Sequence, residues 1–130
     1  MMKLNKNIVL VASLFGALTI AIGAFGAHGL KELVDSKALD SFEIGVRYQM
    51  YHVFALLILG FATIIPSATK KWVFRFFVLG IIFFSGSIYL LSLNSILPFY
   101  VTSIGFLTPL GGLFFIIGWL RLCYGIYMNK

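Results

Sequence analysis

The sequence predicts an all-α membrane protein, a bundle of four transmembrane helices with a short interfacial helix between the first and second, forming one domain over residues 1–130. Only 11% of its residues are charged, against about 25% in a soluble domain, and 61% are hydrophobic. Several apolar stretches approach or exceed the roughly 18 to 20 residues that cross a bilayer. They must cross as helices, because the bilayer offers backbone groups no water.

The first span is predicted over residues 8–28. It follows Lys3 and Lys6 and ends in the small residues of GAFGAHGL, a pattern shared with cleaved secretory signals. Its apolar run of about twenty residues exceeds the roughly 7 to 15 of a signal core, so we interpret it as an uncleaved helix. Gly29 is well placed as a left-handed stop after the last turn.

The connection over residues 29–46 is predicted to contain the short interfacial helix. All four acidic residues of the chain lie in it, and Asp40 with Glu43 three positions later forms a capping-box pattern at a helix start. We expect this helix to run into the second span, over 47–65. The third and fourth spans are predicted over 72–93 and 101–126.

The basic residues predict the orientation, since loops on the cytoplasmic side carry more lysine and arginine. With the N-terminus and C-terminus inside, seven basic residues lie inside and three outside. The inner set is Lys3, Lys6, Lys70, Lys71, Arg75, Arg121 and Lys130, and the outer set is Lys31, Lys37 and Arg47. We therefore expect a multi-pass plasma-membrane protein with both termini cytoplasmic and the acidic connection outside.

Small residues recur at helical spacing in the first and fourth spans. Ala17, Ala21, Ala24 and His28 share one face of the first, and Gly111, Gly118 and Gly125 repeat every seven residues in the fourth. Small residues let transmembrane backbones approach closely. The predicted packing residues are Gly23, Gly26, Gly111, Gly112 and Gly118. The pattern fits a tight left-handed bundle, or a smooth face for self-association or for a larger membrane protein complex.

Several function classes are disfavoured by what the spans lack. No aspartate or glutamate lies within a predicted span, which argues against a proton-coupled transporter. No arrangement of nucleophile, base and carboxylate is visible, so we expect no catalytic residues and no enzyme. The single cysteine, Cys123, excludes an internal disulfide and a metal site of several thiolates, and no metal is expected. The positive charge is a topology signal, and nucleic acid is not an expected partner.

One polar cluster is the candidate site: His28, Arg47, Tyr48, Gln49 and His52. Because the chain leaves through the first span and returns through the second, we expect both histidines in the outer leaflet. Three interpretations stay open. The imidazoles could ligate a haem, the cluster could bind a lipid headgroup or a quinone, or its side chains could hydrogen-bond across helices and hold the bundle in register. The last is preferred, so no cofactor is expected.

Four segments resemble the small membrane proteins of the YgdD and YwdK type, a family catalogued as domain of unknown function 423 that has a small eukaryotic relative. They are GAFGAHGL (23–30), YQMYHVFALLILG (48–60), GIIFFSGSIYLLSL (80–93) and TPLGGLFFIIGWLRL (108–122). The matching motif residues are Gly23, Gly26, His28, Gly29, Tyr48, Gln49, His52, Ser85, Gly86, Ser87, Pro109, Gly111, Gly112 and Trp119. The resemblance implies about four helices in the bacterial inner or plasma membrane and assigns no activity.

Two functions follow as hypotheses. The first is a non-enzymatic structural or accessory component of a membrane assembly, with the lipid bilayer and other membrane protein chains as partners. The alternative is a lipid- or quinone-binding protein that uses the cluster around His28 and His52.

Overall fold

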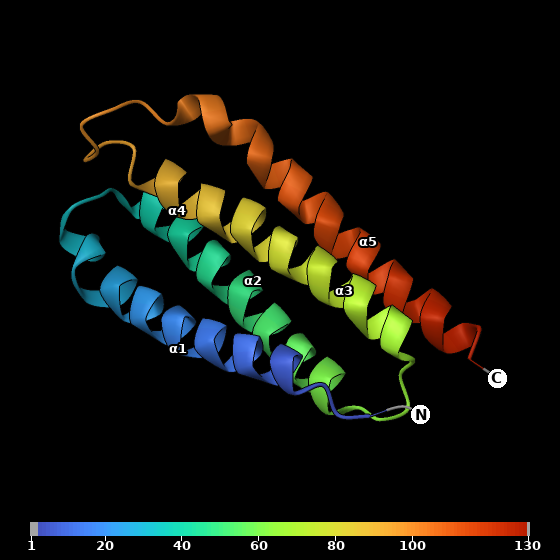
Figure 1. Cartoon of the computed structure of the whole chain (residues 1–130). Helices are drawn as coiled ribbons and strands as arrows, with labels where there is room; N and C mark the ends of the chain where they lie inside the picture. The colour runs from blue at the N-terminus through green and yellow to red at the C-terminus, as the bar shows by residue number, and fades with distance from the viewer. Residues whose placement is uncertain (1–2, 130) are drawn as a thin grey trace.

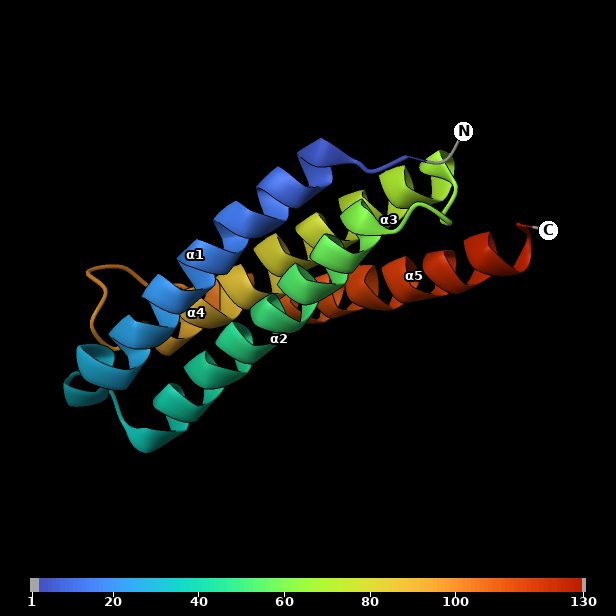
Figure 2. The same ribbon diagram turned by 90° about the horizontal axis from the view of Figure 1, so that it is seen from below.

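A computed structural model describes residues 3–129 of the chain, and every regular element in that range is helical (Figures 1 and 2). The elements are α1 (Lys6–His28), η1 (Leu30–Glu32), α2 (Ser36–Phe61), α3 (Ser67–Gly80), η2 (Ile81–Ser85), α4 (Gly86–Ser92), η3 (Thr102–Phe106) and α5 (Leu107–Tyr127). Among the described residues, four stretches are long and apolar enough to cross a membrane: Lys6–Glu32, Ser36–Phe61, Ser67–Ser92 and Thr102–Tyr127. The predicted four-span, all-α fold is confirmed.

The second and third spans form the middle of the bundle. α1 packs chiefly against α2, and α5 packs against α3 and η2, so the first and last spans flank the central pair (Figures 1 and 2). The flanking spans bury only 17% of their most apolar stretch, against 39% and 33% for the central two. Most of the surface of α1 and α5 is therefore left to face lipid or another protein.

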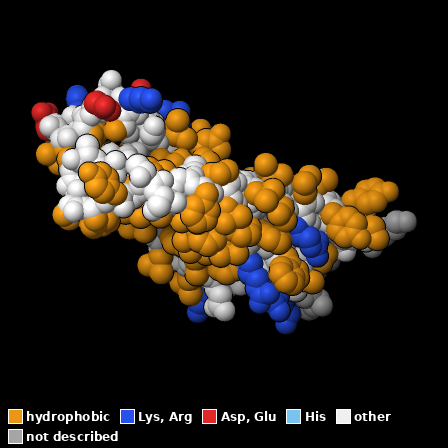
Figure 3. Space-filling model, turned by 90° about the horizontal axis from the view of Figure 1, so that it is seen from above, with side chains coloured by type: hydrophobic (Ala, Val, Ile, Leu, Met, Phe, Trp, Pro, Cys, Tyr) orange, Lys and Arg blue, Asp and Glu red, His pale blue; other side chains and the backbone are white. Residues whose placement is uncertain are grey.

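Charge is divided between the two ends of the molecule. Both chain termini lie at one end of the bundle, opposite the connection between α1 and α2 (Figure 1). On the face seen in Figure 3, acidic and basic side chains gather at the connection end, while lysine and arginine lie at the other, with apolar side chains between. The apolar middle is the part that a bilayer would cover. Lys130, one of the basic residues counted for the inner side, lies outside the described residues.

The second helix begins earlier than expected. Its N-cap is Asp35, whose Oδ1 accepts a hydrogen bond from the Ala38 backbone N–H at 2.8 Å, and the helix continues unbroken from Ser36. The prediction of a capping box at Asp40 and Glu43 is therefore wrong, because both residues lie inside the helix. The segment expected as an interfacial helix is the first three turns of α2, where Phe42 and Gly45 are buried against other helices.

Gly29 is not a left-handed stop. Its φ and ψ are −74° and −50°, so the chain stays right-handed and passes into the single turn of η1. Leu30 at the start of this turn is completely buried. The chain thus reverses between α1 and α2 through a short turn anchored by an apolar side chain.

The alanine face of α1 does not pack against α2. The buried residues of α1 are Ile8, Ala12, Thr19 and Gly26. The alternative face, formed by Ala17, Ala21, Ala24 and His28, is exposed along its whole length. Of the two interpretations left open for this face, packing within the bundle does not fit, because α2 lies on the other side of the helix.

On α1 the two predicted packing glycines do face α2. A Cβ added to Gly26 would lie 2.8 Å from a ring carbon of Phe42, and one added to Gly23 would lie 3.3 Å from Val46 Cγ1. At both positions the absence of a side chain therefore lets the two antiparallel helices approach each other closely.

The seven-residue repeat of glycines on α5 marks its contact with the third span. Gly111, Gly118 and Gly125 are all buried. A Cβ at these positions would meet the backbone of η2, the ring of Phe77 and the side chain of Thr69, respectively. Gly112 differs, because a Cβ there would lie 3.8 Å from the Phe84 ring, an ordinary contact distance. Along this stripe of three glycines, α5 therefore lies close to the third span.

The third span is interrupted by a turn of π-helix, η2, between α3 and α4. A π turn holds one more residue than an α-helical turn and so shifts the faces of the helix that follow it. Before the turn, α3 packs mainly against α5, and after it α4 packs mainly against α2. The shift allows one continuous span to contact two neighbours with its two halves.

Candidate functional site in the polar contacts between helices

His52 is the most enclosed polar ring of the bundle. It lies on α2, is 4% exposed, and stacks face to face on Phe115 of α5 with ring centroids 3.6 Å apart. Its Nδ1 lies 2.7 Å from the Tyr48 carbonyl oxygen, and its Nε2 lies 3.1 Å from Trp119 Nε1. The imidazole therefore joins α2 to α5 within an aromatic setting.

These two hydrogen bonds assign the tautomer of His52. The indole N–H of Trp119 is only a donor, so Nε2 must accept, and the proton lies on Nδ1, from which it is donated to the Tyr48 carbonyl. The ring is then neutral and both of its nitrogens are engaged. In this arrangement His52 presents no free nitrogen to a haem iron or to a ligand.

Other buried polar side chains of the spans also bridge neighbouring helices. The Tyr89 hydroxyl donates to Gln49 Oε1 at 2.6 Å, and Ser85 Oγ donates to the Gly45 carbonyl oxygen at 2.7 Å, both between α2 and the third span. Ser87 Oγ and Thr108 Oγ1 lie 2.6 Å apart and join α4 to α5. Such pairing is what a polar group within apolar surroundings requires.

The structure does not bring His28 and His52 together. α1 and α2 run antiparallel, with Gly26 beside Phe42 and Gly16 beside Val53. His52 therefore lies at the level of about residue 17 of α1, eleven residues from His28, or roughly 16 Å at 1.5 Å per residue. The expectation of a shared outer-leaflet site is wrong, because His52 follows the start of α2 by more than four turns.

The remaining members of the predicted cluster lie on the surface. His28, Arg47 and Tyr48 are exposed, and Arg47 Nη2 lies 3.9 Å from Glu43 Oε2 in an ion pair whose two side chains are each more than half exposed. Only Gln49 and His52 are buried, and they contact different partners. The five residues therefore do not line a common cavity.

Lys70 is a buried cation that the sequence interpretation counted among the basic residues of the inner side. It lies in the first turn of α3 and is 1% exposed. Its Nζ donates to the Lys3 carbonyl oxygen at 2.8 Å and approaches the Gly60 carbonyl oxygen, 3.5 Å away, which also accepts from the Asn5 backbone N–H. A cation at these last carbonyls of α2 offsets the negative end of the helix dipole. Lys70 thus fastens the N-terminal segment to the end of α2.

Replacing Lys70 by methionine is expected to lower the free energy of unfolding by about 1–3 kcal/mol, because the Lys3 carbonyl loses its donor. The matched control is Lys71→Met, since Lys71 is exposed and adjacent. Thermal unfolding of the two variants in the same detergent measures the difference. Equal stability of both variants would show that the buried contacts of Lys70 contribute nothing.

The sequence interpretation did not identify which residues pair with the predicted ones, although Trp119 is among the motif residues. Trp119 and Tyr89 each supply the donor for a buried polar side chain on α2. A signal was available, because an indole or phenol within a span needs a partner for its polar atom. The helix that provides this partner depends on tertiary packing, and the spacing of residues along a single helix does not reveal which helix it is.

A metal centre has no support in the part of the chain that the structure describes. No group of three or more histidine, cysteine, aspartate or glutamate side chains is close enough to hold an ion among residues 3–129. Cys123 is free and exposed on α5. The polar contacts of the spans are pairs of hydrogen-bonding groups rather than ligand sets.

The fold and these contacts define a small, four-span integral membrane protein with polar side chains paired between its helices. The comparisons agree with this class. The model of a family described as "Protein of unknown function (DUF423)" matches residues 22–112. The chain belongs to this DUF423, or UPF0382, family of inner- and cell-membrane proteins, for which no function is known.

Its relatives match it over nearly their whole length. A UPF0382 membrane protein of Staphylococcus saprophyticus is 39% identical over 94% of this chain and 98% of its own. YwdK of Bacillus subtilis is 35% identical over 90% and 93%, and the inner membrane protein YgdD of Escherichia coli is 32% identical over 97% and 93%. No solved structure matches the chain.

Proposed function

We propose that this protein is a non-enzymatic structural or accessory component of a membrane assembly. The observation that carries the proposal is the use of its buried polar side chains. His52, Gln49, Ser85 and Ser87 all take part in hydrogen bonds that hold helices together. Groups committed to packing in this way are not available for acid–base or nucleophilic chemistry.

The outward face of α1 supports an assembly role. Ala17, Ala21 and Ala24 follow one another at spacings of four and three and are exposed, although such small residues usually mark a helix contact. α1 is also one of the two least buried spans. We propose that this alanine face packs against a further transmembrane helix, from a second copy of the chain or from a larger complex.

The same proposal places both termini in the cytoplasm. The basic residues near the ends of the chain outnumber those of the connection between α1 and α2, and lysine and arginine favour the inner side. The acidic connection then faces outward. A lipid or quinone site at His28 and His52 is not part of the proposal, because those residues lie at different depths.

Cysteine cross-linking in native membranes tests the alanine face. In a Cys123→Ser background, Ala21→Cys is expected to form one discrete cross-linked species with a bifunctional maleimide. The control is Ile20→Cys, at almost the same depth but about 100° around the helix, where the side chain is 67% exposed. The mass of the product distinguishes a dimer of the chain from a complex with another protein. Cross-linking no greater at residue 21 than at residue 20 would count against an assembly through this face.

A further inference from the structure

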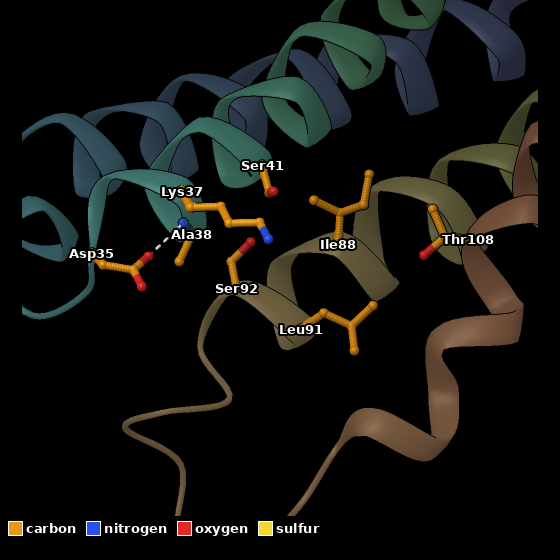
Figure 4. Close-up of a pocket in the computed structure, with 8 residues that line it drawn as sticks. All are labelled: Asp35, Lys37, Ala38, Ser41, Ile88, Leu91, Ser92 and Thr108. Atoms are coloured by element: carbon orange, nitrogen blue, oxygen red, sulfur yellow. Dashed lines mark hydrogen bonds between the residues drawn. The ribbon is translucent and has the colours of Figure 1, made fainter.

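A cavity of about 370 Å³ lies at the end of the bundle opposite the chain termini. It is bounded by the start of α2, the end of α4 and the start of α5 (Figure 4). Its lining residues are Asp35, Lys37, Ala38, Ser41, Ile88, Leu91, Ser92 and Thr108. None of the residues of the predicted histidine cluster is among them.

Ser92 gives the first indication of what the cavity holds. The residue is 4% exposed, and its Oγ is the buried side-chain polar atom that lacks a hydrogen-bond partner among residues 3–129. By contrast, Ser85 and Ser87 in the same span are both bonded. An unpaired buried hydroxyl is unfavourable, and Ser92 is satisfied if a polar group enters the cavity that it lines.

Lys37 gives the second indication. It occupies the second position of α2, where the helix dipole disfavours a cation. In Figure 4 its side chain extends over the cavity toward Ser41 and Ser92. An anionic group placed among these three side chains would accept hydrogen bonds from an ammonium and two hydroxyls.

The walls restrict the kind of anion. Ala38, Ile88 and Leu91 are apolar, and the cavity opens at the end of membrane-spanning helices. Asp35 adds a carboxylate at the rim beside the lysine. A ligand with a phosphate, a neighbouring cation and an attached apolar chain matches all three features.

We propose that this cavity binds the phosphate of a phospholipid headgroup, held by Lys37 Nζ, Ser41 Oγ and Ser92 Oγ, with the acyl chains lying along Ile88 and Leu91. The zwitterionic ethanolamine headgroup suits the site, because its ammonium would lie next to Asp35. This inference is independent of the accessory role proposed above.

Native mass spectrometry of the full, delipidated chain tests the site with three probes. Phosphatidylethanolamine is expected to bind. Diacylglycerol with the same acyl chains and inorganic phosphate are each expected to bind at least tenfold more weakly, because the first lacks the anion and the second lacks the apolar contacts. Inorganic phosphate binding as tightly as the lipid would overturn a lipid as the occupant. Equal binding of diacylglycerol would overturn the role of the phosphate.

Two variants locate the binding. Lys37→Gln and Ser92→Ala are each expected to weaken phosphatidylethanolamine binding about tenfold, whereas the controls Lys31→Gln and Ser13→Ala, outside the cavity, leave it unchanged. Ser92→Ala also removes an unpaired buried oxygen, so its lipid-free melting temperature is expected to equal or exceed that of the wild type. Unchanged lipid binding in folded Lys37→Gln and Ser92→Ala proteins would refute the site.

Discussion

Replacing Gly111 by alanine is expected to destabilise the protein by about 2 kcal/mol. The new Cβ would lie 2.7 Å from the backbone carbonyl carbon of Phe83 and from Phe84 Cα, and backbone cannot rotate away as a side chain can. Overpacking of this kind costs about 1–3 kcal/mol. It outweighs the gain of up to about 1 kcal/mol that alanine brings to a helix interior.

Gly112→Ala is the matched control for this prediction. It makes the same chemical change one residue along α5, where the added Cβ meets only the Phe84 ring at 3.8 Å. We expect unchanged stability or a gain of up to about 1 kcal/mol. Reversible unfolding in detergent, followed by tryptophan fluorescence, measures both variants. If Gly111→Ala is as stable as Gly112→Ala, the close approach of α5 to η2 is not as described.

The hydrogen bond between His52 and Trp119 is expected to couple their contributions to stability. His52→Phe keeps a ring against Phe115 but leaves the Trp119 N–H without its acceptor, and Trp119→Phe removes the donor. Each single change is expected to cost about 1–2 kcal/mol. In a double-mutant cycle we expect a coupling energy of about 0.6 kcal/mol, the average for hydrogen bonds between transmembrane helices, and at most about 1.7 kcal/mol.

Trp72→Phe provides the comparison for this cycle. Trp72 lies on α3, where its ring packs against Phe76 and under the Arg75 guanidinium. The change in the free energy of unfolding caused by Trp72→Phe should add to that caused by His52→Phe, because distant substitutions act independently. A coupling energy for His52 and Trp119 no larger than for His52 and Trp72 would rule out the bridge between α2 and α5.

The number and type of the helices were predictable, because long apolar runs in a single short chain leave few alternatives. The fourth span was placed within one residue at each end, at 102–127 instead of 101–126. The second was misplaced at its start. Asp40, Glu43 and Arg47 made the first turns of α2 resemble a separate interfacial helix, although these side chains project from an exposed face of one continuous helix.

The candidate site was less predictable, because it depends on which helix faces which. Gln49 and His52 were correctly singled out as polar residues within a span, and both are buried. Their partners, Tyr89 and Trp119, lie 40 and 67 residues away in the sequence. Lys70 shows the same limit. In the sequence Lys70 stands beside Lys71 and looks like a second exposed lysine at a helix end. Only the fold shows that it is buried under the N-terminal segment.

The π turn has a consequence for how sequences of this family can change in length. A one-residue deletion in α3, with the π turn kept, would rotate everything beyond it by about 100°. Tyr89 would then point away from Gln49, and Ser87 away from Thr108. A one-residue deletion within Ile81–Ser85 differs, because it removes the extra residue of the π turn and leaves a regular α-helix whose later residues keep their faces. In an alignment of relatives, a one-residue gap at this turn is therefore compatible with the same packing of the third span, whereas a gap in α3 is not.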